Sequence, residues 1–495
     1  MSQSAYDELA ATWRRLHHFS HLQSMASWDR SALMPAGGNT ARADAMAEMD
    51  GLLHAIRTDA GLTKTLERSD TEQLDEFQRA NLREMRRDWR NANALPAALV
   101  QAQSLATARC EHAWRTQRPA NDWQGFLGNF REVLRLAREQ ASRLADATGL
   151  TPHDALMDVY EPGMTGEKLD RLFGDLQQWL PDLVRRVRAK QASEKVVSPV
   201  GPFSKTAQYA IGLEAMKLLG FDFNSGRLDE SAHPFCGGVP EDTRLTTRYR
   251  DDSFVGSLWG VMHETGHGRY EQNLPREWLG QPVAWARSAG IHESQSLSFE
   301  MQIGLSRAFV GLLAPRMAAQ FGNQPAFDAD NLYRWLTRVE PGFIRVEADE
   351  LTYPLHIILR YGIERDLIEG KMEAEDIPAR WDKAMASLLD IDTRGNFNNG
   401  CMQDVHWGSG LFGYFPSYTL GAMYAAQWFA TIRATTPDLD TRMAKGDLAP
   451  AFDWLRDNIW LQGSRWTTDE LVTRATGGPL DATHYRRHLE TRYLA

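Results

Sequence analysis

His263-Glu264-Thr265-Gly266-His267, near the middle of the 495-residue chain, forms the pattern His-Glu-x-x-His. On a helix, side chains four residues apart lie one above the other, so His263 and His267 can bind one metal ion. Glu264 is rotated by about 100° from His263, which is unsuitable for a third ligand but close enough to reach a metal-bound water. Zn²⁺ lowers the pKa of its bound water to about 7, and a nearby carboxylate can accept the proton. The motif therefore predicts a zinc site for hydrolysis.

The residues around this motif support a helix that packs closely against a neighbouring segment. Side chains recur at spacings of three and four residues, at Phe254, Leu258, Val261, Met262 and Thr265. Glycines at 256, 260, 266 and 268 lower the intrinsic helix propensity. Because glycine permits close approach of another backbone, we expect something to pack directly against this helix.

The composition is that of an ordinary globular protein and argues against nucleic-acid and membrane partners. Hydrophobic residues make up 43% of the chain and charged residues 24%, and the formal net charge is −10. No basic stripe stands out, and no stretch approaches the ~18–20 uninterrupted apolar residues of a membrane span. Cys110, Cys236 and Cys401 are widely spaced and odd in number, which favours a reducing cytosol. The N-terminus has no apolar signal core, so we expect a cytoplasmic protein.

Most of the chain has the periodicity of amphipathic helices. Apolar stripes cover 74–89 and 126–144, and similar patterns recur at 166–192, 299–320, 355–370 and 418–433. The exception is 221–253, where turn signals and alternating residues predict one or two short strands. No flexible linker or internal repeat divides the chain. We expect one mostly α domain spanning 1–495, with a cleft between two lobes and a small sheet beside the motif.

A catalytic zinc normally keeps three protein ligands and one open position. The three-histidine class is excluded, because its motif needs Gly at 270 and His at 273, where this chain has Tyr270 and Asn273. A glutamate is the remaining common ligand, and the candidates are Glu271, Glu277, Glu293 and Glu300.

Glu293 is the preferred third ligand among these glutamates. It heads a new helical pattern and is surrounded by hydrogen-bonding side chains. Its alternative role is that of a carboxylate at the positive end of a helix dipole. Glu271 lies too far along the same helix as the histidines, so we expect it to support a ligand or to lie on the surface.

Six ordered segments make the chain resemble the carboxypeptidase Taq family of metallocarboxypeptidases. The resemblance is strongest after residue 230, although Trp28-Asp29 and Met34-Pro35 also look like the family. Leu297 replaces an Arg that often follows the Glu-Ser-Gln-Ser run in the family, which affects a local salt bridge and not the ligand. The segments are 233–235 (His-Pro-Phe), 242–246 (Asp-Thr-Arg-Leu-Thr), 263–267, 292–296 (His-Glu-Ser-Gln-Ser), 344–353 (Ile-Arg-Val-Glu-Ala-Asp-Glu-Leu-Thr-Tyr) and 400–407 (Gly-Cys-Met-Gln-Asp-Val-His-Trp).

The resemblance implies a large helical fold with a cleft, like that of neurolysin and angiotensin-converting enzyme. It also implies a divalent metal, zinc or cobalt, and a homodimer. The implied reaction is removal of single residues from peptide C-termini, with broad side-chain tolerance. Two alternatives are a metallo-oligopeptidase or dipeptidase that cuts short peptides, and a non-catalytic peptide-binding scaffold. The intact Glu264 argues against the scaffold.

Peptide hydrolysis assigns two further roles near the motif. Glu264 is expected to accept a proton from water and then deliver it to the leaving amine. A hydrogen-bond donor must also stabilise the tetrahedral oxyanion, and tyrosine or histidine suits this role. The candidates for this donor are His233, His406, Tyr414 and Tyr418.

The free carboxylate of a peptide C-terminus is best bound by the planar fork of an arginine. Arg345 and Arg244 lie in the segments that resemble the family, and Arg345 is slightly preferred. Tyr353, at the end of the Arg345 segment, is a third substrate-binding candidate. Each arginine has an alternative role in a structural ion pair. Three acids in the same family-like segments are candidates to orient the ligating histidines by hydrogen bonds, namely Asp349, Glu350 and Asp404.

Overall fold

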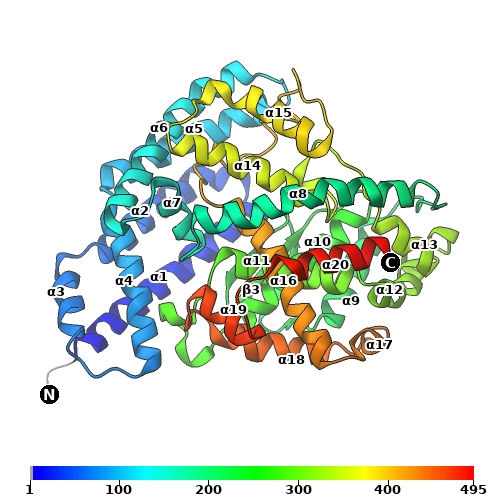
Figure 1. Ribbon diagram of the computed structural model, residues 1–495. Coiled ribbons are helices and arrows are strands. Elements are labelled where there is room, and N and C mark those ends of the chain that lie inside the picture. Colours follow the sequence, from blue (N-terminus) through cyan, green and yellow to red (C-terminus); the bar gives the residue numbers. More distant parts are fainter. Residues whose placement is uncertain (1–3) are drawn as a thin grey trace.

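The described part of the chain, residues 4–495 of the computed structural model, is mostly helical, which confirms the predicted fold class (Figure 1). The first four helices enclose a small hydrophobic core of their own. Trp13, Leu53, Leu66 and Met85, one from each helix, are buried in it. These helices are α1 (Ala5–Ala32), α2 (Asn39–Arg57), α3 (Ala60–Ser69) and α4 (Glu76–Ala94).

Helix α6 illustrates how the predicted apolar stripes contribute to the main core. Its stripe residues Phe126, Phe130, Val133 and Leu144 are all buried, while Arg131 on the opposite face is exposed. Side chains spaced by three and four residues share one face of a helix, so one face is buried and the other is solvated. The helices in this part of the chain are α5 (Ala97–Gln117), α6 (Trp123–Thr148), α7 (Pro152–Tyr160), α8 (Gly166–Gln191) and α9 (Lys205–Leu218).

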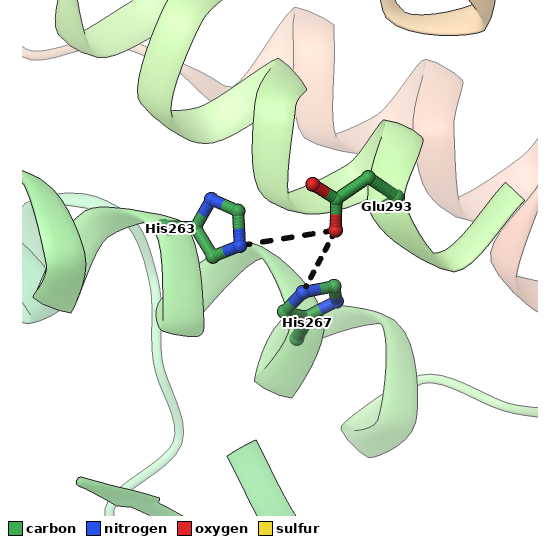
Figure 2. Close-up of side chains that lie close together, drawn as sticks. All are labelled: His263, His267 and Glu293. Carbon is green, nitrogen blue, oxygen red and sulfur yellow. Dashed lines mark ion pairs between the residues drawn. The ribbon is translucent and has the colours of Figure 1, made fainter. Parts of the chain in front are cut away.

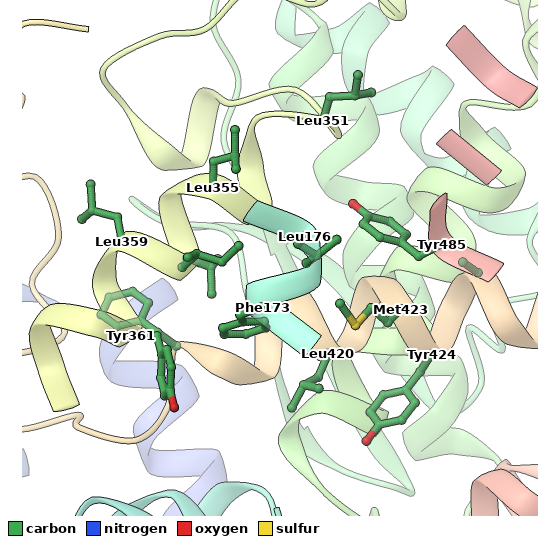
Figure 3. Packing of buried hydrophobic residues seen from close by; sticks show 14 of the residues in the cluster. Phe173, Leu176, Leu351, Leu355, Leu359, Tyr361, Leu420, Met423, Tyr424 and Tyr485 are labelled. Carbon is green, nitrogen blue, oxygen red and sulfur yellow. The ribbon is translucent and has the colours of Figure 1, made fainter. Parts of the chain in front are cut away.

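The centre of the main core joins helices that are far apart in the sequence. Figure 3 shows Phe173 of α8, Leu355 of α14, Leu420 of α16 and Tyr485 of α20 packed together. Full burial of one such side chain stabilises a fold by about 1.5–3 kcal/mol. In the described residues, no helix is both long and apolar enough to cross a membrane. The remaining C-terminal helices are α12 (Arg307–Phe321), α13 (Ala329–Leu336), α14 (Tyr353–Ile368), α15 (Ile377–Leu389), α16 (Pro416–Thr435), α17 (Leu439–Met443), α18 (Ala449–Asn458), α19 (Thr468–Thr476) and α20 (Ala482–Leu494).

The helix predicted at 299–320 is interrupted near its start. A π-helical turn occupies Ser298–Gly304, and α12 begins at Arg307 after a new N-cap, Ser306, whose hydroxyl accepts a hydrogen bond from the backbone of Phe309. Turns of this kind re-aim side chains and are frequent at functional sites. The periodicity of apolar residues continues through the break, so the sequence alone does not reveal it.

The region predicted to contain one or two strands forms a sheet of three. Strand β3 (Asp242–Thr247) lies in the middle, parallel to β1 (Gly226–Glu230) and antiparallel to β2 (Cys236–Val239). Strand β2 is missed from sequence because its Cys-Gly-Gly-Val run has no alternating pattern. Leu245 of β3 is fully buried against the helix that carries the His-Glu-x-x-His motif, so the sheet lies beside the motif as predicted.

The motif helix α10 (Val255–Gln272) and the next helix, α11 (Ala289–Leu297), are in unusually close contact. A Cβ atom built on Gly266 would lie 2.4 Å from the backbone oxygen of Gln295 in α11. On the other side of α11, a Cβ on Gly421 of α16 would lie 2.6 Å from Cγ of Glu293. Helix α11 is therefore held between two glycines, which confirms the expectation that a segment packs directly against the motif helix.

We expect Gly266→Ala to destabilise the protein even though alanine favours helix formation. The added methyl meets backbone, and overpacking of this kind costs about 1–3 kcal/mol, more than the roughly 1 kcal/mol gained in helix propensity. Gly260→Ala on the same helix is the matched control, because nothing lies within 4 Å of its Cβ position. The measurement is the free energy of unfolding in urea. An unfolding midpoint for Gly266→Ala at or above that of Gly260→Ala would contradict this packing.

Candidate metal centre and catalytic cleft

Two helices bring the three predicted metal ligands together. Helix α10 presents His263 and His267 one turn apart, and α11 presents Glu293 opposite them (Figure 2). Oε2 of Glu293 lies 3.8 Å from Nε2 of His263 and 3.4 Å from Nε2 of His267. All three ligand atoms lie within 4.8 Å of one another. Tetrahedral zinc with bonds near 2.0–2.1 Å places its ligands roughly 3.3 Å apart, so these residues fit such an ion.

Both histidines are oriented by hydrogen bonds on the side away from this centre. Nδ1 of His263 lies 2.8 Å from Oε2 of Glu300, which the π-helical turn carries. Nδ1 of His267 lies 2.6 Å from Nδ1 of His292, and Nε2 of His292 lies 2.7 Å from Oε1 of Glu271. Donation of each Nδ1 proton outward leaves both Nε2 lone pairs facing the centre, as metal binding requires. Glu271 is thus linked through His292 to the candidate ligand His267.

The electrostatics of the centre favour a cation. Burial opposes protonation of His263, but the carboxylates of Glu293 and Glu300 outweigh it and raise its pKa to about 10. Burial alone would raise the pKa of Glu293, yet the neighbouring His263 and His267 lower it to about 2. Burial lowers the pKa of His267 to about 4. At neutral pH Glu293 is therefore ionised, His267 is neutral, and His263 carries a proton that a bound metal ion would replace.

Glu264 lies beside the ligands and is only 7% exposed. Burial, reinforced by the negative charges of Glu293 and Glu300, raises the pKa of Glu264 to about 7. A carboxyl group with a pKa in this range can both accept and release a proton near neutral pH. Its position one residue after His263 leaves it next to the centre without pointing at it.

The centre opens into a cavity of about 650 Å³. Tyr414 and Tyr418, at the start of α16, line this cavity together with the metal-ligand candidates. The other walls come from strand β2 and from helices α4 and α7. Its lining residues are Arg87, Val159, Tyr160, Pro162, Pro234, Phe235, Cys236, His263, Glu264, His267, Ala286, Arg287, Ser288, Ala289, His292, Glu293, Tyr414 and Tyr418.

Three of the predicted site residues lie directly behind Tyr418 and do not line the cavity. Nε2 of His406 lies 3.1 Å from the Tyr418 hydroxyl. The guanidinium of Arg345 lies 5.0 Å from the Tyr418 ring and donates to the Tyr353 hydroxyl at 2.6 Å. Burial lowers the pKa of His406 to about 4, so this imidazole is neutral near pH 7. The group forms a second layer that holds Tyr418 in place.

The structure does not bring His233 and Arg244 to the cavity. His233 is exposed between β1 and β2, although the next residues, Pro234 and Phe235, do line the cavity. Arg244 pairs with Asp242 at 2.6 Å and stacks on the ring of Trp28. The ion-pair alternative therefore describes Arg244 in this structure.

The acids expected to orient the ligating histidines do not do so, and that expectation is wrong. Asp404 pairs with Arg345 at 2.8 Å and also with Arg360. Glu350 pairs with Arg492 at 2.8 Å, and Asp349 accepts hydrogen bonds from Thr352. Asp349 and Glu350 lie near Arg345 in the sequence and Asp404 lies near His406, but these positions do not determine the direction of the side chains. The histidines are instead oriented by Glu300 and by His292 with Glu271.

Two arginines that the sequence did not predict as site residues lie at the cavity wall. Arg287 is 4% exposed and forms a two-pronged ion pair with Glu84 of α4. Arg87, one turn further along α4, donates to the backbone oxygen of Val159 at 2.9 Å. Arg87 belongs to a basic helix face that is indistinguishable in sequence from a solvated one, so only the fold reveals its position.

We expect Glu300→Gln to weaken divalent-metal binding by about 10–100-fold, since it removes the charge that supports His263. The measurement is competition for the metal with a chromogenic chelator. Glu277→Gln is the control, because Glu277 is exposed and lies away from the cavity. Unchanged affinity in Glu300→Gln would show that the Nδ1 bond contributes nothing to metal binding.

Comparison with known proteins places the chain in one family along its whole length. The sequence model of the carboxypeptidase Taq (M32) metallopeptidases matches residues 8–493. The thermostable carboxypeptidase 1 of Thermus thermophilus is 37% identical over 100% of this chain and 99% of its own. Carboxypeptidase 1 of Bacillus subtilis is 32% identical over 97% and 96%.

Solved structures of carboxypeptidases have the same fold as this chain. The Trypanosoma cruzi metallocarboxypeptidase 1 has a TM-score of 0.97 at 46% identity, with 99% of both chains covered. A Pyrococcus furiosus carboxypeptidase has a TM-score of 0.94 at 31% identity, covering 100% of this chain and 99% of its own. The chain therefore belongs to the carboxypeptidase Taq (M32) family and is a metallocarboxypeptidase that requires a divalent metal.

Proposed function

We propose that this protein removes single residues from the C-termini of peptides, with zinc held by His263, His267 and Glu293. The observation that carries this proposal is the convergence of their three ligand atoms beside Glu264, at the wall of a cavity of about 650 Å³. Zinc in this position would supply Lewis acidity and a nucleophilic water at neutral pH. Cobalt is a second metal that the same ligands suit.

The side chains around the centre supply the proton transfers. Glu264 accepts a proton from the attacking water and delivers it to the amine of the departing residue. Tyr414 and Tyr418 face the same cavity and provide phenol donors for the oxyanion of the tetrahedral intermediate. Burial raises the pKa of both phenols well above neutral, so both keep the proton that they donate. His406 supports Tyr418 from behind.

Arg345 is the proposed recognition residue for the substrate carboxylate. Arg345 and Arg360 are buried and share a single acid, Asp404, which leaves one positive charge without a carboxylate. A buried, uncompensated charge is costly, and an incoming carboxylate would neutralise it. The charge lies behind Tyr418, and Tyr353 extends the same group, so contact between Arg345 and a substrate carboxylate requires the Tyr418 side chain to move aside. Arg87, which lines the cavity, is the rival candidate.

The proposal extends to the domain extent, the cellular location and the oligomeric state of the protein. A family match over 8–493 supports one catalytic domain spanning 1–495. The described cysteines Cys110, Cys236 and Cys401 are all free, which supports a cytoplasmic protein. A homodimer is proposed from the family resemblance.

We expect Glu264→Gln to retain zinc and to lose turnover by at least about 10²–10⁴-fold, since it removes the proton acceptor but none of the ligands. Metal content and kcat are measured on the same preparation. Near-normal turnover with full zinc would contradict the role of Glu264. Bound peptide without any turnover in the wild type would favour a scaffold.

Free-acid and amidated forms of one peptide test C-terminal recognition. We expect the wild type to prefer the free acid, and Arg345→Lys to reduce this preference by about tenfold or more, because lysine keeps the charge but loses the fork. Arg244→Lys, outside the cavity, is the control and should leave the ratio of kcat/KM values unchanged.

Two results would overturn this assignment. Equal cleavage of both peptides by the wild type would favour an oligopeptidase. Loss of preference in Arg87→Lys rather than in Arg345→Lys would assign carboxylate recognition to Arg87.

A further inference from the structure

A second cavity lies between α16 and α20, apart from the catalytic cleft. Its volume is about 800 Å³, and it shares no lining residue with the cleft. Residues of α12, α13 and α17 complete its walls, at the end of the molecule where the C-terminus lies (Figure 1). Cavities of about 300–1,000 Å³ are the usual size for small-molecule ligands.

The lining of this cavity is strongly basic. It contains one acid, Asp440, and five cationic side chains, namely Arg307, Arg433, Lys445, Arg487 and Arg492. This contrasts with the whole chain, whose formal net charge is −10. Such a local excess of positive charge attracts anions even to an acidic protein.

Two of these cations are not neutralised. Arg492 pairs with Glu350 at 2.8 Å, and Arg433 lies 3.6 Å from Asp440. Lys445 and Arg487, in contrast, form no ion pair with any carboxylate in the described part of the chain. Two cations without a carboxylate partner in the lining of one cavity suit a ligand with more than one negative charge.

A buried amide in the cavity wall also lacks a partner. Gln302 is 2% exposed, and its Oε1 accepts no hydrogen bond from the described residues. Its Nε2 lies 3.1 Å from Nε2 of His488, which is also 2.7 Å from Oε1 of Glu350. Because that ring nitrogen donates its proton to Glu350, it cannot accept another from Gln302.

The opposite amide orientation resolves this conflict. With the oxygen of Gln302 facing His488, the ring N–H is shared between Glu350 and that oxygen, and the NH₂ group takes the buried position that has no partner among the described residues. A buried NH₂ without an acceptor is costly. Nδ1 of His484, another lining residue, is likewise buried without a partner.

We propose that this cavity binds a small phosphate-bearing molecule, with Lys445 and Arg487 as donors. The lining also contains small apolar side chains and the aromatic ring of a tyrosine, which suit the uncharged part of a phosphate ester. These residues are Ala308, Ala426, Ala430, Ala444 and Tyr333.

Calorimetric titration of the metal-loaded protein with inorganic phosphate and with AMP, at fixed ionic strength, tests this site. Monophosphates are chosen because they compete only weakly for the catalytic metal. We expect one saturable site per chain, and about tenfold weaker binding in Arg487→Ala and in Lys445→Ala. Tighter binding of AMP identifies an ester as the ligand type, and equal binding identifies phosphate itself.

Arg486→Ala is the matched control, because Arg486 is the neighbouring residue on α20, pairs with Glu490 and lies outside the cavity. It should bind both probes as the wild type does. Peptidase activity should be unchanged in all three variants, which verifies folding. Absence of saturable binding at millimolar concentration would overturn the site, as would equal weakening by Arg486→Ala.

Discussion

The contact between α10 and α11 is the constraint on which the rest of the site depends. Gly266 lets the two backbones approach to a distance that no side chain would permit, with its Cβ position 2.4 Å from the Gln295 oxygen. On the far side of α11, Gly421 likewise allows α16 to approach Glu293 closely. Glu293 can therefore reach two histidines on a neighbouring helix with a short side chain whose own position is fixed by packing.

The contact between α10 and α11 also determines where the charged side chains of the site lie. Glu264, Glu293 and Glu300 gather around His263 in a largely buried space. A concentration of carboxylates in a low-dielectric site is unfavourable unless cations balance it. The outer hydrogen bonds to Glu300 and His292 fix which nitrogen of each ring faces inward, so the charge excess is directed at one point. The cluster of carboxylates, which is unfavourable for stability, therefore favours the binding of a cation.

Helix α16 contributes residues to both the catalytic cleft and the second cavity. The first turn of α16 carries Tyr418 into the catalytic cleft, and its last turns carry Arg433 to the basic cavity. Most residues of α16 between these two ends are buried in the main core. Helix α4, from the small N-terminal core, supplies Arg87 to the cleft and so joins the two hydrophobic cores around one site.

The sequence by itself determined the helical class, the motif helix and the three residues whose ligand atoms converge, because these depend on periodicity and on spacing along one or two helices. Glu300 and His292 as supports, Arg87 in the cleft wall, and the exposure of His233 were decided only by tertiary structure. The direction of a side chain depends on the packing of segments hundreds of residues apart, and on local breaks such as the π-helical turn at Ser298–Gly304. Neither leaves a periodic signal in the chain, whereas a hydrogen-bond partner or a cavity wall exists only once those segments meet.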